Sequence, residues 1–408
     1  MGGARAIRRA LLAALVLVLV ALVVALAVTY APPAPPSPTA TPSTSPVARL
    51  LAARIVVSLP QGGARRAQTE GIANAVRLAV EDANGRVNTG DASVTLEVDI
   101  LDSAGPDGAW SEAAERANAD RATSDRSVIA YIGPGTLDAA KVVAPVAASA
   151  GLLVVTPTLT HPALTTRGYD DALFDALHPG GAPVFIRTIP SDETAARATL
   201  RWAADRSLTP VAADRDDPWS KAFADAAAAR GLRPTSPSPA DAFVYLGGAP
   251  ADEAGQRVRE LRRQRANVVV GAAESVLSDA FLRSAGAAAE GAVATFAGRP
   301  LERYSGPSGA FARAYRGRFL IDPDPYAIFG YDAARLALDS LRRSRQGAIV
   351  DRSAVRDAAF ATKELEGALG TWSVDARGES SYATLQLYAV KALPSAGFAW
   401  VWDSEITP

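Results

Sequence analysis

The chain of 408 residues contains no cysteine, one methionine and only two histidines. The absence of cysteine excludes disulfide bonds, thiolate metal sites, a cysteine nucleophile and a lipid-modified N-terminal cysteine. Neither His161 nor His178 has a second histidine three or four residues away, so the sequence predicts no transition-metal site. We expect no cofactor.

An excess of charge of one sign is also missing. The chain has 42 Lys and Arg against 43 Asp and Glu, interspersed throughout, so it lacks the basic surface that nucleic acid requires. It contains neither a GxxxxGK[ST] phosphate loop nor a GxSxG nucleophile elbow. Gly133 and Gly135 start a dinucleotide fingerprint, but Asp138 stands where the third glycine is needed. These absences favour a binding protein over an enzyme.

One long apolar run stands at the N-terminus. Arg5, Arg8 and Arg9 precede an uninterrupted apolar segment from Ala10 to Ala27, close to the ~20 residues that a helix needs to cross a bilayer. Residues 1–30 are therefore predicted to be a cytoplasmic basic tip and an uncleaved membrane anchor, with the remainder of the chain extracytoplasmic. The small-x-small sequence ending at Ala27 leaves a cleavable signal open, in which case the protein would be secreted.

A charge-free segment rich in proline, serine and threonine follows at residues 31–48. Such a composition predicts an extended polyproline II spacer without a packed core.

Strand-like and helix-like patterns alternate through the remainder of the chain. The first series predicts strands at 54–59, 94–102, 127–133 and 151–157 and helices at 71–84, 111–122 and 137–150. The second predicts strands at 184–189, 209–214, 241–247, 266–272 and 291–297 and helices at 191–206, 219–230 and 251–265. This alternation predicts an α/β protein with two doubly wound, parallel-sheet lobes. Ligands of such sheets bind beyond the carboxyl ends of the strands, so the site is expected at strand-to-helix junctions.

The most unusual junction is VVTPTLTHPALTTRGY, Val154 to Tyr169. Hydroxyls and free backbone N–H groups at a strand end can bind a carboxylate without carrying charge themselves. The same threonines can instead cap helices and stabilise turns.

This stretch, followed by FIRTIPSDETAARA, resembles the branched-chain amino-acid (leucine/isoleucine/valine) binding proteins of ABC transporters, which have the type I periplasmic-binding-protein fold. In that family a strand-end S-P-x-x-T-N-P-x-L-T is followed by R-T-x-P-S-D. The resemblance extends over nearly all of the chain from Arg54 onward. It also includes IGPGTLDAAKVVAPVAASAG, AAAEGAVATF, PYAIFGYDAARLALDSL and GTWSVDARGESSYATLQLYAVK.

The resemblance implies two lobes joined by three crossings, near Pro190, Ala297 and Trp372. We expect lobe 1 to comprise residues 52–190 plus 298–372, and lobe 2 residues 191–297 plus 373–408.

In lobe 1 the resemblance implies three ligand-binding positions. Thr160 falls on the hydroxyl that binds the ligand's α-carboxylate, and Leu159 on a position that uses its backbone. Thr136 lies one residue before Leu137, which occupies the position of a family serine, so either Thr136 serves in its place or the carboxylate clamp is incomplete. His161 replaces the usual asparagine and is interpreted as a turn residue.

Three further candidates complete the predicted site. Trp219 stands where the family commonly has a tyrosine that closes over the ligand, although a helix-packing role is the alternative. Glu274 lies near the acidic position that pairs with the ligand ammonium, and Ala273 fits that position equally well. Gln68, in the first loop, is expected to reach the cleft.

The resemblance implies a monomeric extracytoplasmic solute-binding protein that closes on an amino acid or similar small polar ligand and delivers it to an ABC permease. The alternative is a membrane-anchored ligand sensor or interaction module with a diverged cleft, which a neighbouring membrane signalling protein reads. Three departures from the usual family pattern favour this alternative: the uncleaved anchor, the missing lipid cysteine and the altered cleft residues.

Overall fold

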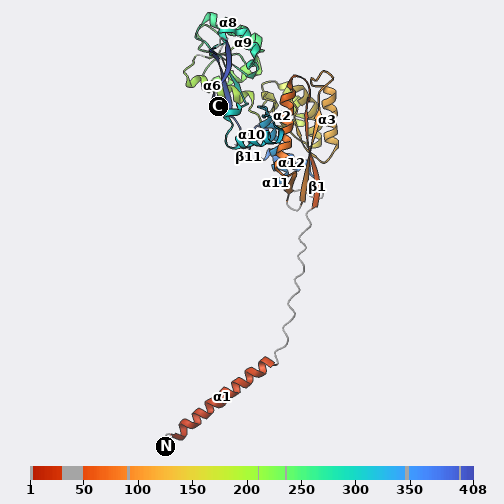
Figure 1. The fold of residues 1–408 in the computed structure, drawn as a ribbon, viewed down its shortest axis with the longest axis vertical. Coiled ribbons are helices and arrows are strands. Elements are labelled where there is room, and N and C mark those ends of the chain that lie inside the picture. Colours follow the sequence, from red (N-terminus) through yellow and green to blue (C-terminus); the bar gives the residue numbers. More distant parts are fainter. Residues whose placement is uncertain are drawn as a thin grey trace. The chain divides into compact units, whose positions relative to one another are not determined.

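A computed structural model describes residues 3–29, 49–89, 92–209, 211–234, 237–344, 349–394 and 397–408 (Figure 1). It separates into two compact units, residues 1–47 and residues 48–408. The spacer predicted at residues 31–48 lies outside the described residues.

The first unit contains one helix, α1 (Gly3–Thr29). Its segment Ile7–Leu26 is long and apolar enough to cross a membrane, and no part of it is buried against other protein. A signal sequence has the same properties, so the apolar helix is confirmed while the choice between anchor and signal is not.

The first sheet of the second unit has the strand order β2-β3-β1-β4-β5-β6. Its strands are β1 (Arg49–Leu59), β2 (Arg86–Thr89), β3 (Ala92–Asp102), β4 (Val128–Ile132), β5 (Leu153–Thr156) and β6 (Phe185–Arg187). The helices that follow these strands are α2 (Arg66–Asp82), α3 (Glu112–Ser124), α4 (Leu137–Ala150) and α5 (Asp171–Leu177). Three later helices also belong to this part: α10 (Gly306–Phe319), α11 (Ala327–Arg343) and α12 (Arg352–Phe360). α10 and α11 pack against α2, and α12 packs against β4 and β5. We call the first sheet and these helices the first lobe.

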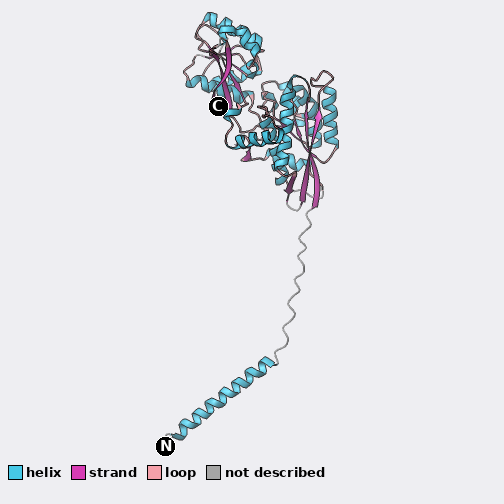
Figure 2. Ribbon diagram, viewed as in Figure 1, coloured by secondary structure: helices cyan, strands magenta, loops and turns pink. Residues whose placement is uncertain are grey.

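The second sheet has the order β14-β13-β10-β9-β8-β7. Its strands are β7 (Val211–Ala213), β8 (Phe243–Tyr245), β9 (Val269–Ala272), β10 (Val293–Phe296), β13 (Leu385–Ala392) and β14 (Phe398–Ile406). Its helices are α6 (Asp192–Asp205), α7 (Pro218–Ala229), α8 (Ala251–Gln264) and α9 (Asp279–Ala285). We call this sheet and its helices the second lobe; Figure 2 shows helices beside the strands of each sheet.

The two α/β sheets are predicted to be parallel, and the structure shows that each also contains antiparallel strands. β2 is antiparallel to β3, and β13 is antiparallel to both β10 and β14. Only two residues separate β2 from β3, and five separate β13 from β14. A parallel neighbour needs a crossover of a dozen or more residues, so connections this short permit only antiparallel pairing.

The cores explain why the strands have continuous apolar runs. In β1, Ile55 and Val57 are buried in a cluster with residues of α2 and α11, whereas Val56 is buried in a cluster with residues of α3 and α4. A strand covered on both faces has no solvent side, so it loses the polar alternation of a half-exposed strand.

Three connections carry the chain between the two sheets: β6 to β7, β10 to the helices of the first lobe, and β12 back to β13. The hairpin of β11 (Leu365–Gly367) and β12 (Gly370–Trp372) precedes the third connection. The fully buried Asp332 of α11 secures this hairpin, since its carboxylate accepts from the Ala368 amide at 2.7 Å and from the Trp372 indole at 2.9 Å. The residue ranges predicted for the lobes stay a prediction.

Candidate functional site

Thr156, the last residue of β5, shapes the loop that follows. Its buried hydroxyl donates to the Pro134 carbonyl oxygen at 3.1 Å and accepts from the Leu159 amide at 3.2 Å. His161 contributes to the same loop, because its Nδ1 accepts from the Ala163 amide at 3.1 Å. Both side chains therefore stabilise the turn, and for His161 this is the predicted role.

Arg187, the last residue of β6, stabilises this loop through hydrogen bonds. Its fully buried guanidinium donates to the carbonyl oxygens of Leu159 and His161, each at 3.1 Å, and to the Thr165 hydroxyl at 2.8 Å. It also forms an ion pair with Glu379, on the third connection, at 2.8 Å. One buried cation thus fixes the conformation of the loop and joins it to that connection.

Asp192 is the most unusual group near this loop. It is the first residue of α6, is only 5% exposed, and its amide donates to the Thr160 carbonyl oxygen at 2.9 Å. Burial raises the pKa of Asp192 to about 7, while the Thr160 hydroxyl, the Arg187 charge and the Trp219 indole lower it. Among the residues that the structure describes, its Oδ2 has no hydrogen-bond partner. An unpaired buried carboxylate oxygen is costly, so a ligand or water is expected to bind it.

Further buried polar atoms of the second lobe also lack partners among the described residues, including one on α7 and one on β8. The Ser220 hydroxyl of α7 and the Tyr245 hydroxyl of β8 are buried and lack partners within the described part of the chain. The charge of Asp192 contributes to raising the Tyr245 pKa, after the larger effect of burial, which indicates that the two groups are neighbours. Asp192, Ser220 and Tyr245 all belong to the second lobe, and in the first lobe the Thr158 hydroxyl of the loop after β5 also lacks a partner within the described residues.

Trp219 lies at the N-terminus of α7, beside these groups. A side-chain carbon at Gly248 would come within 2.7 Å of the indole ring, so the ring lies directly on this glycine backbone. The ring of His161, from the first lobe, is 6.4 Å away at an edge-on angle of 84°. The indole thus connects the two lobes and is only partly buried.

Glu274, in the loop after β9, also contacts the first lobe. Its Oε1 accepts from the Tyr326 hydroxyl, just before α11, at 2.9 Å. Protein atoms around the carboxyl raise the Glu274 pKa, but the residue is exposed, so we expect water to screen most of this effect. Its charge helps to raise the pKa of Asp192, which indicates that the two carboxylates share one neighbourhood.

Three of the predicted residues, Thr160, Trp219 and Glu274, therefore gather around Asp192. Leu159 adjoins them, but its amide and its carbonyl oxygen already bond Thr156 and Arg187.

Thr136 and Gln68, the two remaining candidates, make no contact with Asp192 in the described part of the chain. Thr136 is half-buried, and its hydroxyl caps α4 by accepting from the Ala139 amide at 3.2 Å. Gln68 is half-buried in the first turn of α2.

Sequence reasoning missed Asp192 itself. The signal was present in R-T-x-P-S-D, but an aspartate in the first turn of a helix is common because it favours the helix dipole. Only burial without a partner distinguishes this carboxylate from an ordinary one.

A metal centre finds no support in the described residues, which contain no cluster of three or more histidine, aspartate or glutamate side chains suited to a metal ion.

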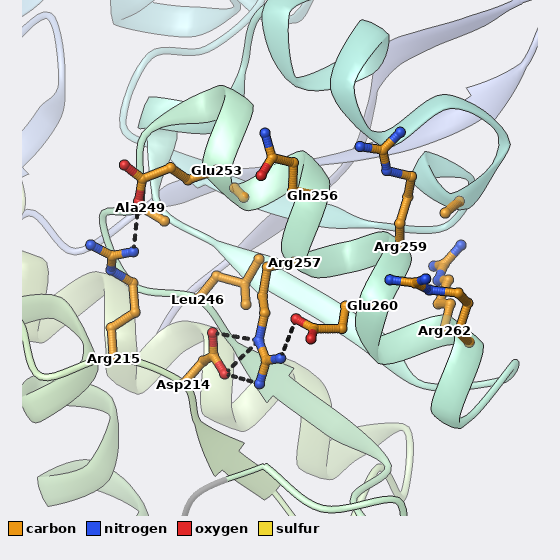
Figure 3. Close-up of a pocket in the computed structure, with 13 residues that line it drawn as sticks. Asp214, Arg215, Leu246, Ala249, Glu253, Gln256, Arg257, Arg259, Glu260 and Arg262 are labelled. Carbon is orange, nitrogen blue, oxygen red and sulfur yellow. Dashed lines mark hydrogen bonds and ion pairs between the residues drawn. The ribbon is translucent and has the colours of Figure 1, made fainter.

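A surface groove of about 930 Å³ lies along α8 in the second lobe (Figure 3). The residues recorded as lining it include none of the predicted site residues. Its carboxylates already have partners: Arg257 pairs with Asp214 and Glu260, each at 2.7 Å, and Arg215 pairs with Glu253 at 3.1 Å (Figure 3). Three further arginines, Arg259, Arg262 and Arg263, leave this groove with an excess of positive charge. Since none of the predicted site residues lines it, we assign the site to the groups around Asp192.

The fold is that of the type I periplasmic binding proteins, in which two α/β lobes are connected by the chain. The chain belongs to the family described as the receptor family ligand binding region, whose model matches residues 71–288, more than half of its length. The family consists of binding proteins, in agreement with the prediction that the chain is not an enzyme. Among curated proteins, nothing matches the chain.

Solved structures with this fold include transport proteins of several bacteria. A leucine binding protein, LivK, from Thermotoga maritima MSB8 is 19% identical, with a TM-score of 0.62 over 87% of this chain and 99% of that one. A putative branched-chain amino acid ABC transporter from Rhodospirillum rubrum is 21% identical, with a TM-score of 0.63 over 86% and 100%. A solute binding protein of an ABC transporter from Rhodopseudomonas palustris BisB5, in complex with 3,4-dihydroxy benzoic acid, is 18% identical, with a TM-score of 0.58 over 87% and 97%.

Proposed function

We propose that this protein is an extracytoplasmic solute-binding protein that closes its two lobes on an amino acid or similar small polar ligand and presents it to an ABC importer. The observation that carries this proposal is the buried Asp192 carboxylate, whose Oδ2 lacks a partner among the described residues. The proteins of similar fold add support, since their names refer to leucine, branched-chain amino acids and an aromatic acid.

The charges of the site favour a ligand with a cationic or hydrogen-bond-donating end. Asp192 and Glu274 present carboxylates, and the protein offers no recorded salt-bridge partner to either within its described residues. An ammonium between them would replace hydration with charge-assisted hydrogen bonds. We propose that the hydroxyls of Thr160 and Thr136 receive the ligand's carboxylate, and that the Leu159 amide joins them by exchanging its bond to Thr156 for one to the ligand. Trp219 and Gln68 would contact the remainder of the ligand.

Closure follows from groups that lie on different lobes. A ligand that contacts Thr160 of the first lobe and Trp219 of the second makes its full set of contacts only when the lobes are together. It therefore has higher affinity for the closed state, and this difference in affinity drives the motion.

The first experiment is a thermal-shift screen of the full chain in detergent against amino acids, amides, small organic acids and aromatic acids. A ligand at 100 times its Kd is expected to add about 2.7 kcal/mol to the free energy of unfolding, which raises the melting temperature measurably. Asp192→Asn should abolish the shift. Asp279→Asn is the matched control, because Asp279 is likewise the first residue of a helix but is exposed.

If a ligand raises the melting temperature of Asp192→Asn as much as that of the natural sequence, the proposed site is wrong. If no amino acid shifts the melting temperature but an aromatic acid does, the protein is a solute receptor of a different specificity.

A membrane-anchored sensor remains the second candidate, favoured by the apolar helix Gly3–Thr29 and by the absence of cysteine. We propose that the helix stays uncleaved, so that the protein is a monomer held to the membrane by one span. Intact mass of the purified protein tests this directly, since signal cleavage would remove the N-terminal segment. Copurification with a permease then supports transport, whereas copurification with a signalling protein supports sensing.

A further inference from the structure

A second cavity lies at the connections between the lobes, apart from the groups around Asp192. Its volume is about 120 Å³, and the residues recorded as lining it include none of the predicted ligand-binding residues. Ala297 and Arg299 border it from the chain that leaves β10, and Tyr382 from the chain that enters β13. The cavity thus touches two of the three connections.

The chemistry of the lining favours a small neutral ring. Ile328, Phe329 and Ala368 are almost completely buried and form an apolar part of the lining. Tyr304 and Tyr382 add hydroxyls, and burial raises the pKa of Tyr382 to about 12 and that of Tyr304 further, so both stay protonated and neutral.

Charge in the cavity is already neutralised. Among the described residues that line the cavity, only Arg299 has a charged side chain. Its guanidinium pairs with Glu405 of β14. An anionic ligand would have to displace this carboxylate, so the cavity fits a neutral molecule better. An engineered apolar cavity of about 150 Å³ in another protein binds benzene, which shows that a cavity of this order accepts one ring.

We propose that this cavity is a regulatory site for a small neutral phenol-like molecule, whose binding stabilises the described arrangement of the lobes. When two lobes close, the backbone dihedrals of the connecting segments change. A molecule in contact with Ala297 and Tyr382 on two such segments fits one arrangement better than the other, and so changes the equilibrium between them. This regulation rests on the proposed function, because it requires that the lobes move.

The binding test uses 4-fluorophenol and fluorine NMR on the full chain in detergent. We expect saturable binding to the natural sequence, and a loss of at least about tenfold in affinity for Ala368→Leu, because the added carbons overfill the cavity. Tyr304→Phe preserves the shape and should weaken binding by about fivefold through the lost hydrogen bond. Because all variants are measured in the same detergent, partition of the probe into micelles cancels.

The cleft variant Asp192→Asn should bind the probe as the natural sequence does. The proposal is overturned if the natural sequence shows no binding, if neither Ala368→Leu nor Tyr304→Phe weakens it, or if Asp192→Asn abolishes it. In the last case the probe occupies the main site.

The second experiment measures the distance between the two lobes with spin labels. Because the chain has no cysteine, spin labels attach only at introduced positions, and Asp138→Cys in α4 with Asp252→Cys in α8 places one exposed label on each lobe. We expect 4-fluorophenol to narrow the distribution of label distances, and Ala368→Leu to narrow it without the probe.

Binding without a change in this distribution would overturn the regulatory role. If 4-fluorophenol binds at the connections but no ligand raises the melting temperature in the thermal-shift screen, the cavity is confirmed as a binding site. The same result would contradict the proposed transport function. The two hypotheses therefore fail separately.

Discussion

At the scale of single residues, Asp192 and Arg187 are the two buried charges that organise the candidate site. Arg187 has four partners, which include the carboxylate of Glu379. Asp192 has one oxygen without any partner recorded in the described chain. The Nε of Arg187 is also buried without a partner, but its other two guanidinium nitrogens bond four groups of the fold, so Arg187 is a structural charge, whereas the free oxygen of Asp192 is available to a ligand.

The raised pKa of Asp192 makes stability depend on pH. Since burial raises that pKa from an ordinary 3.8 to about 7, the folded protein retains a proton that the unfolded chain has already released. The free energy of unfolding therefore falls as pH rises from about 4 to 7, and the loss is constant at higher pH. Asp192→Asn removes this loss.

We expect Asp192→Asn to be more stable than the natural sequence at pH 8, by about 2 to 4 kcal/mol, and to match it at pH 4. Thermal unfolding at both pH values measures the difference, and groups common to both proteins cancel. An equal effect at pH 4 and pH 8 would show that Asp192 titrates normally.

For Arg187, we expect Arg187→Met to lower the free energy of unfolding by about 3 to 5 kcal/mol, because Glu379 and the loop carbonyls lose their buried partner. Adding Glu379→Gln should recover part of the loss by removing the unpaired carboxylate. Urea unfolding measures both. Arg356→Met is the control: its ion pair with Asp357 is accessible to solvent, with side chains 32% and 68% exposed, so the cost should stay below about 1 kcal/mol.

At the scale of elements, the contact between α2 and α11 connects parts of the chain that are far apart in sequence. A side-chain carbon added at Gly330 of α11 would lie 2.8 Å from the Ile72 side chain and 3.1 Å from its carbonyl oxygen. The helices can therefore approach this closely only because residue 330 is glycine.

This contact predicts opposite effects for two glycines in helices. Gly330→Ala should destabilise the protein by about 1 to 3 kcal/mol, because the clash outweighs the gain in helix propensity. Gly317→Ala, in α10, should stabilise it by about 0.5 to 1 kcal/mol, because Gly317 is exposed and nothing lies near its missing side chain. Melting followed by circular dichroism measures both; a stabilising Gly330→Ala would refute the close packing.

Many elements could be predicted because their patterns are local. The helix predicted at 137–150 is α4 (Leu137–Ala150), with Thr136 as its N-cap and Gly151 in the left-handed conformation at its end. The strand predicted at 94–102 lies within β3. The antiparallel strand β2 was missed, because four residues with alternating burial are too short to give a clear period.

At the scale of the whole molecule, all four hydrophobic clusters consist of residues from the unit 48–408. We therefore expect residues 49–408 alone to be soluble, monomeric and α/β, and to melt at the same temperature as the full chain. Circular dichroism and analytical ultracentrifugation measure this. Aggregation of residues 49–408, or a lower melting temperature, would show that the N-terminal segment contributes to the fold.

By itself, the sequence determined the alternation of strands and helices, the apolar N-terminal helix, the exclusion of thiol chemistry and the junction at which the candidate site lies. These follow from hydrophobic periodicity, composition and short motifs, which act over a few residues. Only the tertiary structure decided that Asp192 is buried without a full set of partners, that β13 and β14 join the second sheet as antiparallel strands, and that a cavity lies at the connections. Burial depends on residues brought together from distant parts of the chain, which no local pattern records.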